Sequence, residues 1–413
     1  MNLLLINQHY PPDAGATGKV LAELAEELAH RGHAVTALTG RPSYREARGT
    51  EAPARERRHG VTVERVRVLP RRDGALGRMA HYLSFAVAAT WRGVRLQRPD
   101  AILAFSSTPF FGGLAVRVLA ALKRVPYVYV VQDAWPEIAV ALGALRPGWR
   151  ERVARLFEGW TWRGAERVIV IGEELATLAA VRGVAADRVS VIENWADASR
   201  IVPQHISRFR RDLGFSDDDF VVEYAGNLGH AQALDTVLEA ARVVRETSRA
   251  IRFLFVGEGA RAATFRRRAE LVPGVVCAPF QPEDRLSDVL AAADLGVVPL
   301  KSGLARYCVP SKVYSILASG RPVAAAVDAD SEVARLIERA ECGFRVDPDD
   351  PKSLAAEILR LAGDRPEAKA LGRRGRVFCE REASLAKAAD RYEFLLAGVI
   401  GRQDSDRNDR SRD

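Results

Sequence analysis

The chain has 413 residues, which is long enough for two or three domains with separate hydrophobic cores. Hydrophobic residues make up 48% and charged residues 28%, as is typical of soluble globular proteins. The net charge of +8 suits nucleic acid, an anionic membrane surface or phosphate-bearing small molecules, but no basic run is interleaved with aromatic residues, which argues against nucleic acid.

The spacing of the cysteines and the length of the apolar runs indicate the cellular compartment of the protein. The cysteines lie far apart and include no CxxC pair, so they predict neither a zinc site nor a disulfide framework, and they favour a reducing compartment. The first residues lack the charged leader and cleavage site of a signal peptide, and no run of about 18 apolar residues could span a bilayer. The sequence therefore predicts a cytoplasmic protein without a metal.

Strand and helix patterns alternate through the first half of the chain. An apolar run opens the chain, and leucines at helical spacing follow it up to Gly32. Strands are predicted at residues 2–7, 34–39, 62–68, 101–105, 126–131, 167–171 and 189–192, with helices at 18–31 and between most of the others. This order predicts a parallel sheet with helices on both faces.

A second alternation begins after a polar linker at 198–219, whose run Asp217-Asp-Asp219 predicts a helix cap or a solvated turn rather than a metal site. Strands are predicted at 220–225, 252–257, 275–278, 295–299 and 323–327, and helices at 233–246, 260–270, 284–292 and 331–340. After residue 350 the pattern is mainly helical to about residue 400.

The predicted fold is α/β, with two tandem doubly wound Rossmann-like domains facing a central cleft. The domains are expected at 1–197 and 198–385, followed by a helix at 386–400 that packs back toward the first domain and a disordered tail at 401–413. In such sheets ligands bind beyond the carboxyl ends of the strands. The turn after the first strand lacks the G-x-G-x-x-G pattern of NAD dehydrogenases.

The segment Pro310-Ser-Lys-Val-Tyr-Ser-Ile-Leu-Ala-Ser-Gly320 predicts a short helix that leads into a buried strand. The start of this helix would offer backbone N–H groups at Ser311, Lys312 and Val313 beside the lysine ammonium, a combination that suits a diphosphate. An ordinary capped helix would have the same pattern.

Residues 71–98 combine an apolar middle with arginines at both ends. As an interfacial helix, this segment would place Tyr82, Phe85 and Trp91 against lipid and its arginines at anionic headgroups. The alternative is a core helix with solvated ends.

Six motifs resemble those of the family 4 retaining glycosyltransferases, and most closely the branch that builds bacterial O-antigen, capsule and colanic-acid-like polysaccharides. In chain order they are Tyr10-Pro-Pro-Asp-Ala-Gly-Ala-Thr-Gly-Lys19, Val131-Gln-Asp-Ala-Trp-Pro-Glu137, Asn194-Trp-Ala-Asp197, Tyr224-Ala-Gly-Asn-Leu-Gly229, Val256-Gly-Glu-Gly259 and the segment starting at Pro310. The resemblance covers residues 1 to about 400. It implies a GT-B fold, a nucleotide-diphosphate sugar donor bound mostly by the C-terminal half, and no required metal or other cofactor.

The resemblance also implies a donor-binding set of backbone and side-chain groups: Gly15, Gly226, Asn227, Gly229, Gln232, Glu258, Ser311, Lys312, Val313 and Ser315. Several positions depart from the family pattern. Asn227 and Gln232 stand where the family has an arginine and a lysine, Tyr307 and Ser315 stand where it has two glutamates, and Gln132 replaces a histidine. Three cations could supply the lost positive charge: Lys312, Arg306 and Arg321.

Asp133 and Glu137 follow the predicted strand at 126–131 and are expected at the carboxyl end of the first sheet. Asp133 is predicted either to position the acceptor or to act as a base, and a structural cap for the Trp135-Pro136 turn is the alternative. With Lys312, these two carboxylates form the predicted catalytic set.

The predicted function is retaining transfer of a hexosyl or N-acetylhexosaminyl group from a UDP- or GDP-type donor to a saccharide or polyprenyl-diphosphate-linked acceptor, with possible peripheral contact with the plasma membrane. One alternative is a non-hydrolysing UDP-sugar 2-epimerase, although the seven histidines are widely scattered. The other is a non-catalytic nucleotide-sugar-binding scaffold, suggested by the replaced glutamates and arginine.

Overall fold

The fold is described from a computed structural model, whose described residues are 1–13, 16–42, 52–70, 72, 74–106, 111–204 and 207–410. The chain divides into two compact units, one formed by Met1–Glu193 with Leu385–Asp413 and the other by Asn194–Ser384. The chain therefore passes from one unit to the other twice, at 193/194 and at 384/385. The boundaries expected from the sequence were 197/198 and 385/386.

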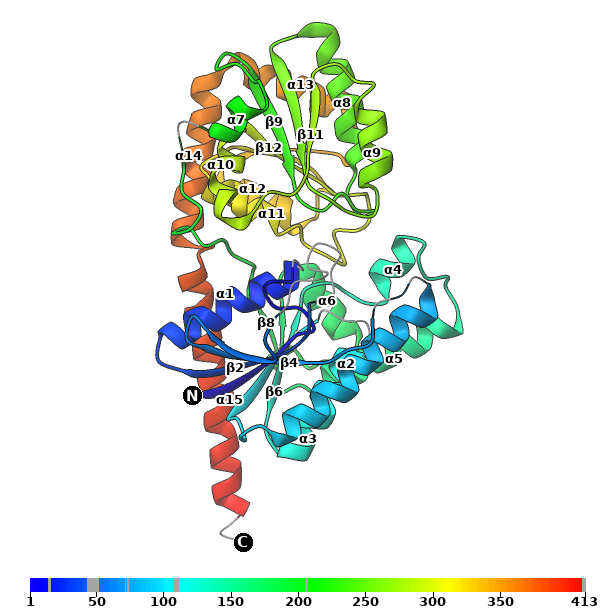
Figure 1. The fold of residues 1–413 in the computed structure, drawn as a ribbon, viewed down its shortest axis with the longest axis vertical. Helices are drawn as coiled ribbons and strands as arrows, with labels where there is room; N and C mark the ends of the chain where they lie inside the picture. Colours follow the sequence, from blue (N-terminus) through cyan, green and yellow to red (C-terminus); the bar gives the residue numbers. More distant parts are fainter. Residues whose placement is uncertain are drawn as a thin grey trace. The chain divides into compact units, whose positions relative to one another are not determined.

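The N-terminal unit is built on a sheet with the order β3-β4-β2-β1-β5-β6-β7-β8 in the described part of the chain (Figure 1). All neighbouring strands are parallel except β3 and β4, which are antiparallel. The strands are β1 (Asn2–Ile6), β2 (Ala34–Gly40), β3 (Arg55–Arg58), β4 (Val61–Val66), β5 (Ala101–Phe105), β6 (Tyr127–Val131), β7 (Arg167–Val170) and β8 (Val189–Val191). Buried apolar runs explain the central strands, whereas β3 is the charged edge strand Arg-Glu-Arg-Arg, which was not predicted.

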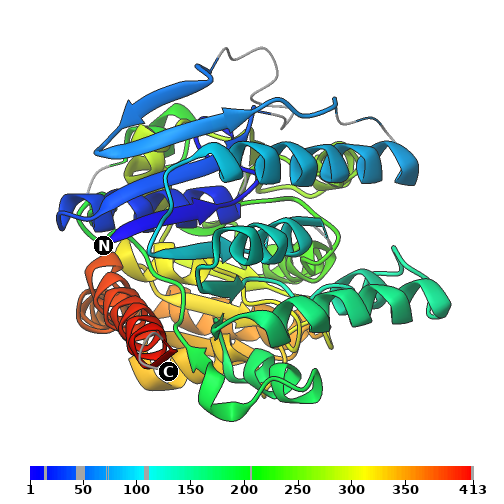
Figure 2. The same cartoon turned by 90° about the horizontal axis from the view of Figure 1, so that it is seen from below.

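Helices cover both faces of this sheet (Figures 1 and 2). The helices of the unit are α1 (Ala16–His30), α2 (Ala75–Arg95), α3 (Phe111–Lys123), α4 (Glu137–Ala141), α5 (Trp149–Gly164), α6 (Glu173–Val181) and α15 (Leu385–Arg410). α1 and α15 lie on one face, and α2, α3 and α5 lie side by side on the other.

The last helix, α15, packs on α1 and β5. Arg31 binds Asp390 at 2.7 Å and Glu393 at 3.1 Å, and His33 binds Glu393 at 2.8 Å. The helix continues to Arg410, so the prediction of a disordered tail from residue 401 is wrong for residues 401–410. Extending a helix that packing already holds requires less free energy than nucleating a new helix, so a polar sequence can continue an existing helix.

The C-terminal unit has a parallel sheet with the order β11-β10-β9-β12-β13-β14 among the described residues. Its strands are β9 (Phe220–Ala225), β10 (Ile251–Val256), β11 (Val275–Ala278), β12 (Leu295–Pro299), β13 (Val323–Ala326) and β14 (Gly343–Val346). Its helices are α7 (Arg208–Asp212), α8 (Leu234–Thr247), α9 (Ala262–Ala269), α10 (Leu286–Ala291), α11 (Lys312–Ala318), α12 (Glu332–Ala340), α13 (Pro351–Gly363) and α14 (Arg365–Arg381). In the segment 198–219, which was predicted as a linker, the Asp219 carboxylate accepts a hydrogen bond from Ser216 N at 2.8 Å. Asp219 therefore belongs to a turn.

Candidate functional site

Two glycine loops follow adjacent strands at the carboxyl edge of the second sheet. β9 leads into Gly226-Asn-Leu-Gly229 and the neighbouring β10 leads into Gly257-Glu-Gly259. Gly257 has a φ of 152°, and a β-carbon there would lie 1.9 Å from the Gly226 carbonyl oxygen. Only glycine therefore lets the two backbones approach this closely.

Lys312, the first residue of α11, reaches this pair of loops. A β-carbon on Gly226 would lie 3.4 Å from the Lys312 Nζ, and the ammonium lies 3.7 Å from the centre of the Tyr224 ring. The Tyr224 hydroxyl donates to the Asn227 carbonyl at 2.6 Å, which ties the ring to the loop. The predicted Gly226, Asn227 and Lys312 thus lie together, and Tyr224 completes the group.

The half-buried Lys312 makes no ion pair within the part of the chain that the structure describes. Burial lowers the pKa of its ammonium to about 7. A cation that has lost water without gaining a carboxylate is destabilised until an anion binds. The arrangement therefore suits an anionic ligand placed against Gly226.

The start of α11 differs in part from the prediction. Val313 N already donates to the Pro310 carbonyl at 3.3 Å, and the Val313 side chain lies in the core. The backbone N–H groups of Ser311 and Lys312 have no protein acceptor among the described residues, so two of the three predicted donors are available for a ligand. Ser315 is half-buried and lies one helical turn from Lys312, on the same side of α11.

The other predicted loop residues hold the loops in shape. The Gln232 Oε1 accepts from Gly229 N at 3.2 Å, so this N–H is already satisfied. Glu258 forms an ion pair with Arg266 at 2.5 Å, and the same guanidinium donates to the Gly257 carbonyl at 2.8 Å. Neither Arg266 nor Tyr224 was predicted as a site residue, although Tyr224 opens the motif that contains Gly226 and Gly229.

Arg321 does not supply the charge that the family arginine would give. Its guanidinium donates to the carbonyls of Gln204 at 2.9 Å and Ala291 at 3.1 Å, beyond the carboxyl end of α11. Arg306 is exposed. Of the three predicted cations, Lys312 is therefore the one that the structure brings to the glycine loops. The predicted Gly15 lies outside the described residues.

In the N-terminal unit, the segment after β6 contains the predicted carboxylates. Asp133 is exposed, whereas Glu137 is buried and paired with Arg182 at 2.5 Å and Arg155 at 3.3 Å. Arg182 also donates to the Trp135 carbonyl. Both Glu137 oxygens are thus occupied in fixing the turn, which leaves Asp133 as the carboxylate available to a substrate.

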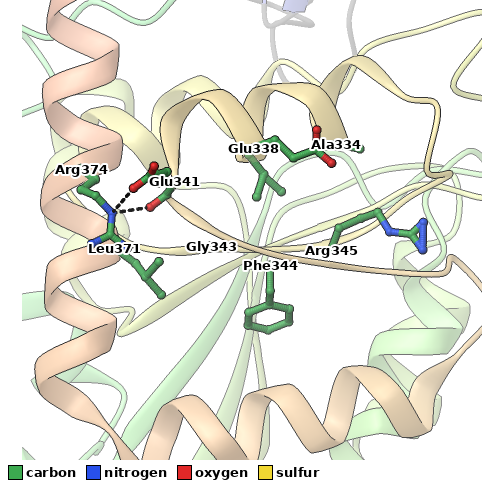
Figure 3. Close-up of a pocket in the computed structure, with 9 residues that line it drawn as sticks. Ala334, Glu338, Glu341, Gly343, Phe344, Arg345, Leu371 and Arg374 are labelled. Carbon is green, nitrogen blue, oxygen red and sulfur yellow. Dashed lines mark hydrogen bonds and ion pairs between the residues drawn. The ribbon is translucent and has the colours of Figure 1, made fainter.

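Figure 3 shows a surface pocket of about 460 Å³ in the C-terminal unit, between α12, β14 and α14. It lies at Gly343, where β14 begins, and so at the opposite sheet edge from the glycine loops. Its charges partly cancel, because Arg374 Nε lies 3.6 Å from the Glu341 carboxylate and donates to the Glu341 carbonyl at 2.8 Å. This pocket is separate from the Lys312 site.

The geometry agrees with comparisons to known proteins. Residues 15–195 match the family described as glycosyl transferase 4-like domain, and residues 219–364 match glycosyl transferases group 1. The chain belongs to the GT-B glycosyltransferases. This membership confirms the prediction of a glycosyltransferase with the GT-B fold, and it favours transfer over epimerisation.

Individual relatives of this GT-B glycosyltransferase extend over most of the chain. A protein of Escherichia coli (strain K12), named as the colanic acid biosynthesis glycosyl transferase WcaI, is 29% identical over 87% of this chain and 91% of its own. Sucrose-phosphate synthase from Thermosynechococcus elongatus superimposes with a TM-score of 0.78 at 18% identity, covering 97% and 100% of the two chains. Anabaena HepE in complex with UDP and glucose superimposes with a TM-score of 0.72 at 19% identity, covering 96% of this chain and 99% of the HepE chain.

Binding of a nucleoside diphosphate is expected to take up a proton. Since the pKa of Lys312 is about 7 in the ligand-free protein, the amine is mostly neutral at pH 8, and a bound diphosphate would raise that pKa. The affinity should therefore fall as the pH rises above 7. Calorimetry at pH 8 in buffers of different ionisation enthalpy measures the uptake, and an enthalpy independent of the buffer would contradict this role for Lys312.

Proposed function

We propose that this glycosyltransferase moves a hexosyl or N-acetylhexosaminyl group from a UDP- or GDP-sugar to a saccharide or polyprenyl-diphosphate-linked acceptor, with retention at the anomeric carbon and without a required metal. The observation that supports it is the Lys312 ammonium, which lies against Gly226 at the carboxyl edge of the sheet and has no carboxylate partner among the described residues. HepE has been solved with UDP-glucose, which makes UDP-sugars the first donors to test.

Breaking the bond between the sugar and the phosphate leaves negative charge on the departing diphosphate. Fixed cations and N–H dipoles that are already in place stabilise this charge most effectively. Lys312, with the N–H groups of Ser311 and Lys312, would supply them, and Glu258 would accept from a hydroxyl of the donor. The acceptor oxygen forms the new bond to the anomeric carbon, and its proton passes to the departing phosphate.

In the N-terminal unit we propose that the exposed Asp133 positions the acceptor hydroxyl. Glu137, which was predicted as catalytic, is proposed as a positioning residue because two arginines occupy its carboxylate. We further propose a cytoplasmic protein at the inner face of the plasma membrane, where a lipid-linked acceptor would be present. No helix in the described ranges combines the length and the apolar character that crossing a membrane requires.

Turnover with candidate donors tests this function. A thermal-shift screen of nucleotides and nucleotide sugars identifies the donor, because ligand at about 100 times its dissociation constant stabilises the protein by roughly 2.7 kcal/mol. Release of the nucleoside diphosphate together with a new glycoside supports transfer. A changed monosaccharide would instead indicate an epimerase, and binding without turnover would indicate a scaffold.

Replacing Asp133 by asparagine is expected to lower kcat/KM by about 100-fold, the lower end of the range for a lost proton-handling or orienting group. The affinity for the nucleotide should not change, because Asp133 belongs to the N-terminal unit and the Lys312 site to the C-terminal unit. Steady-state kinetics and calorimetry measure the two effects. Full activity in the variant would remove Asp133 from the proposal.

A further inference from the structure

One side of α2 exposes a stripe of large apolar side chains. The residues recur every three or four positions, so they lie along one side of the helix: Leu76, Met79, Leu83, Val87, Trp91 and Val94, each 45–85% exposed. Phe85, which was predicted to contact lipid, is instead in the core at 1% exposure. Of the two other aromatic residues predicted there, Tyr82 is half-buried and Trp91 is exposed.

The stripe continues across the two neighbouring helices. α3 packs against both α2 and α5, and Figure 2 shows the three helices side by side. α3 adds Val118 and Leu122, and α5 adds Trp149, Val153, Leu156, Phe157 and Trp160. We call this surface the α2–α3–α5 face.

The α2–α3–α5 face differs from the rest of the surface in its apolar content. Of the 20 large apolar side chains exposed among the described residues, 13 lie on these three helices. Apolar residues exposed singly are ordinary on a soluble protein, whereas a contiguous apolar surface marks a site of interaction. The apolar content of the face therefore indicates an interaction surface.

The charge on the face indicates which partner. The sequences of α2 and α3 contain no Asp or Glu, but they contain Arg78, Arg95, Arg117 and Lys123, together with Arg92, which is paired with Glu64 at 2.9 Å. On α5, Glu151 is paired with Arg155, and the buried Glu158 accepts from the Trp162 indole. The face is therefore apolar and positively charged.

Arginines are stacked on the exposed tryptophans of this face. Arg95 lies 3.4 Å from the ring centre of Trp91, Arg150 lies 5.5 Å from that of Trp149, and Arg117 from α3 lies 3.8 Å from that of Trp160 on α5. Indole and guanidinium groups together suit the boundary between lipid headgroups and acyl chains, where one part of each side chain is apolar and the other is solvated.

We propose that the α2–α3–α5 face docks on an anionic lipid bilayer, with its tryptophans and leucines at the headgroup boundary and its arginines on lipid phosphates. A second copy of the chain would bring two positively charged faces together, which is unfavourable. An anionic bilayer satisfies both the apolar area and the charge. The inference is independent of the sugar donor and could hold even if the proposed transfer reaction were wrong.

Vesicle flotation tests the docking with the whole chain. We expect binding to phosphatidylcholine vesicles that contain phosphatidylglycerol, weak binding to pure phosphatidylcholine, and weakening at high salt. The double substitution Trp91→Ser with Trp149→Ser should lower partitioning at least about tenfold. Arg78→Glu with Arg150→Glu should also lower it, because both arginines are exposed.

Matched controls lie on the other side of the sheet, on α15. Phe394→Ser and Arg391→Glu replace an exposed aromatic residue and an exposed arginine in the same unit, and both variants should bind vesicles as the parent does. Unchanged UDP affinity and melting temperature in each variant establish that the fold is intact.

Quenching of tryptophan fluorescence by brominated lipids measures how deeply the α2–α3–α5 face enters the bilayer. Trp91, Trp149 and Trp160 are exposed, whereas Trp162 and Trp195 are buried, so quenching should be strong in the parent. In the double variant only Trp160 of these three remains, and weaker partitioning should reduce the quenching further. Equal binding by the double variant and the parent, or no binding to anionic vesicles, would overturn the proposal. A dimer in light scattering that the double substitution dissociates would also overturn it, in favour of contact between copies.

Discussion

Replacing Lys312 by methionine is expected to lower the affinity for UDP or another bound nucleoside diphosphate by about 10- to 100-fold. The methionine keeps the length and apolar stem of the side chain but removes the charge beside Gly226. A hydrogen bond to a charged group contributes about 1.5–3 kcal/mol, which corresponds to this change in affinity. Isothermal titration calorimetry at pH 7 measures it directly.

The same substitution should not lower the stability of the ligand-free protein. Burial lowers the pKa of Lys312, so the folded protein holds this proton less tightly than the unfolded chain does. The charge on Lys312 therefore opposes folding most below pH 7. The methionine variant should exceed the parent in its free energy of unfolding by the largest amount in this pH range. Lys301→Met is the matched control, because Lys301 is an exposed lysine of the same unit. Equal UDP affinity in the Lys312 and Lys301 variants would contradict the role of Lys312.

Replacing Glu137 by alanine is expected to destabilise the protein by about 3–5 kcal/mol, because it leaves the buried Arg182 without its carboxylate. Arg182 also stacks on the Trp162 ring at 4.0 Å, so the unpaired guanidinium cannot simply move into water. Urea unfolding measures the loss.

Two further variants distinguish this structural role from catalysis. Asp187→Ala removes an exposed carboxylate of the same unit and should change the free energy of unfolding by less than about 0.5 kcal/mol. Leucine at both Glu137 and Arg182 removes the pair together and should recover much of the lost stability. Activity that recovers together with stability in the double variant supports a structural role for Glu137, whereas a stable double variant without activity would contradict a purely structural role.

The parallel strands were predictable because buried central strands need continuous apolar runs, such as Leu295–Pro299. The two strands that were missed have other patterns. β3 consists of charged residues at a sheet edge, and β14 begins with Gly343 and contains Arg345. Their pairing with β4 and β13 is decided by tertiary contacts rather than by local periodicity.

The site was predictable where motifs place backbone near a ligand, as at Gly226 and Lys312. The groups that support those residues could not be predicted, because they come from distant segments. Arg182 lies 45 positions from the Glu137 it binds, and Tyr224 in β9 contacts Lys312 at the start of α11. A single sequence does not encode such pairs in any local pattern.

The course of the chain has a consequence for how the protein forms during synthesis. α15 is synthesised after the other described helices and strands of both units, yet Tyr392 and Leu396 are both 0% exposed in the N-terminal unit. A nascent chain that ends before Leu385 therefore has an incomplete first unit, with the surface of α1 still in contact with solvent. The C-terminal unit can therefore complete its fold before the N-terminal unit does, although most of the N-terminal unit is translated first.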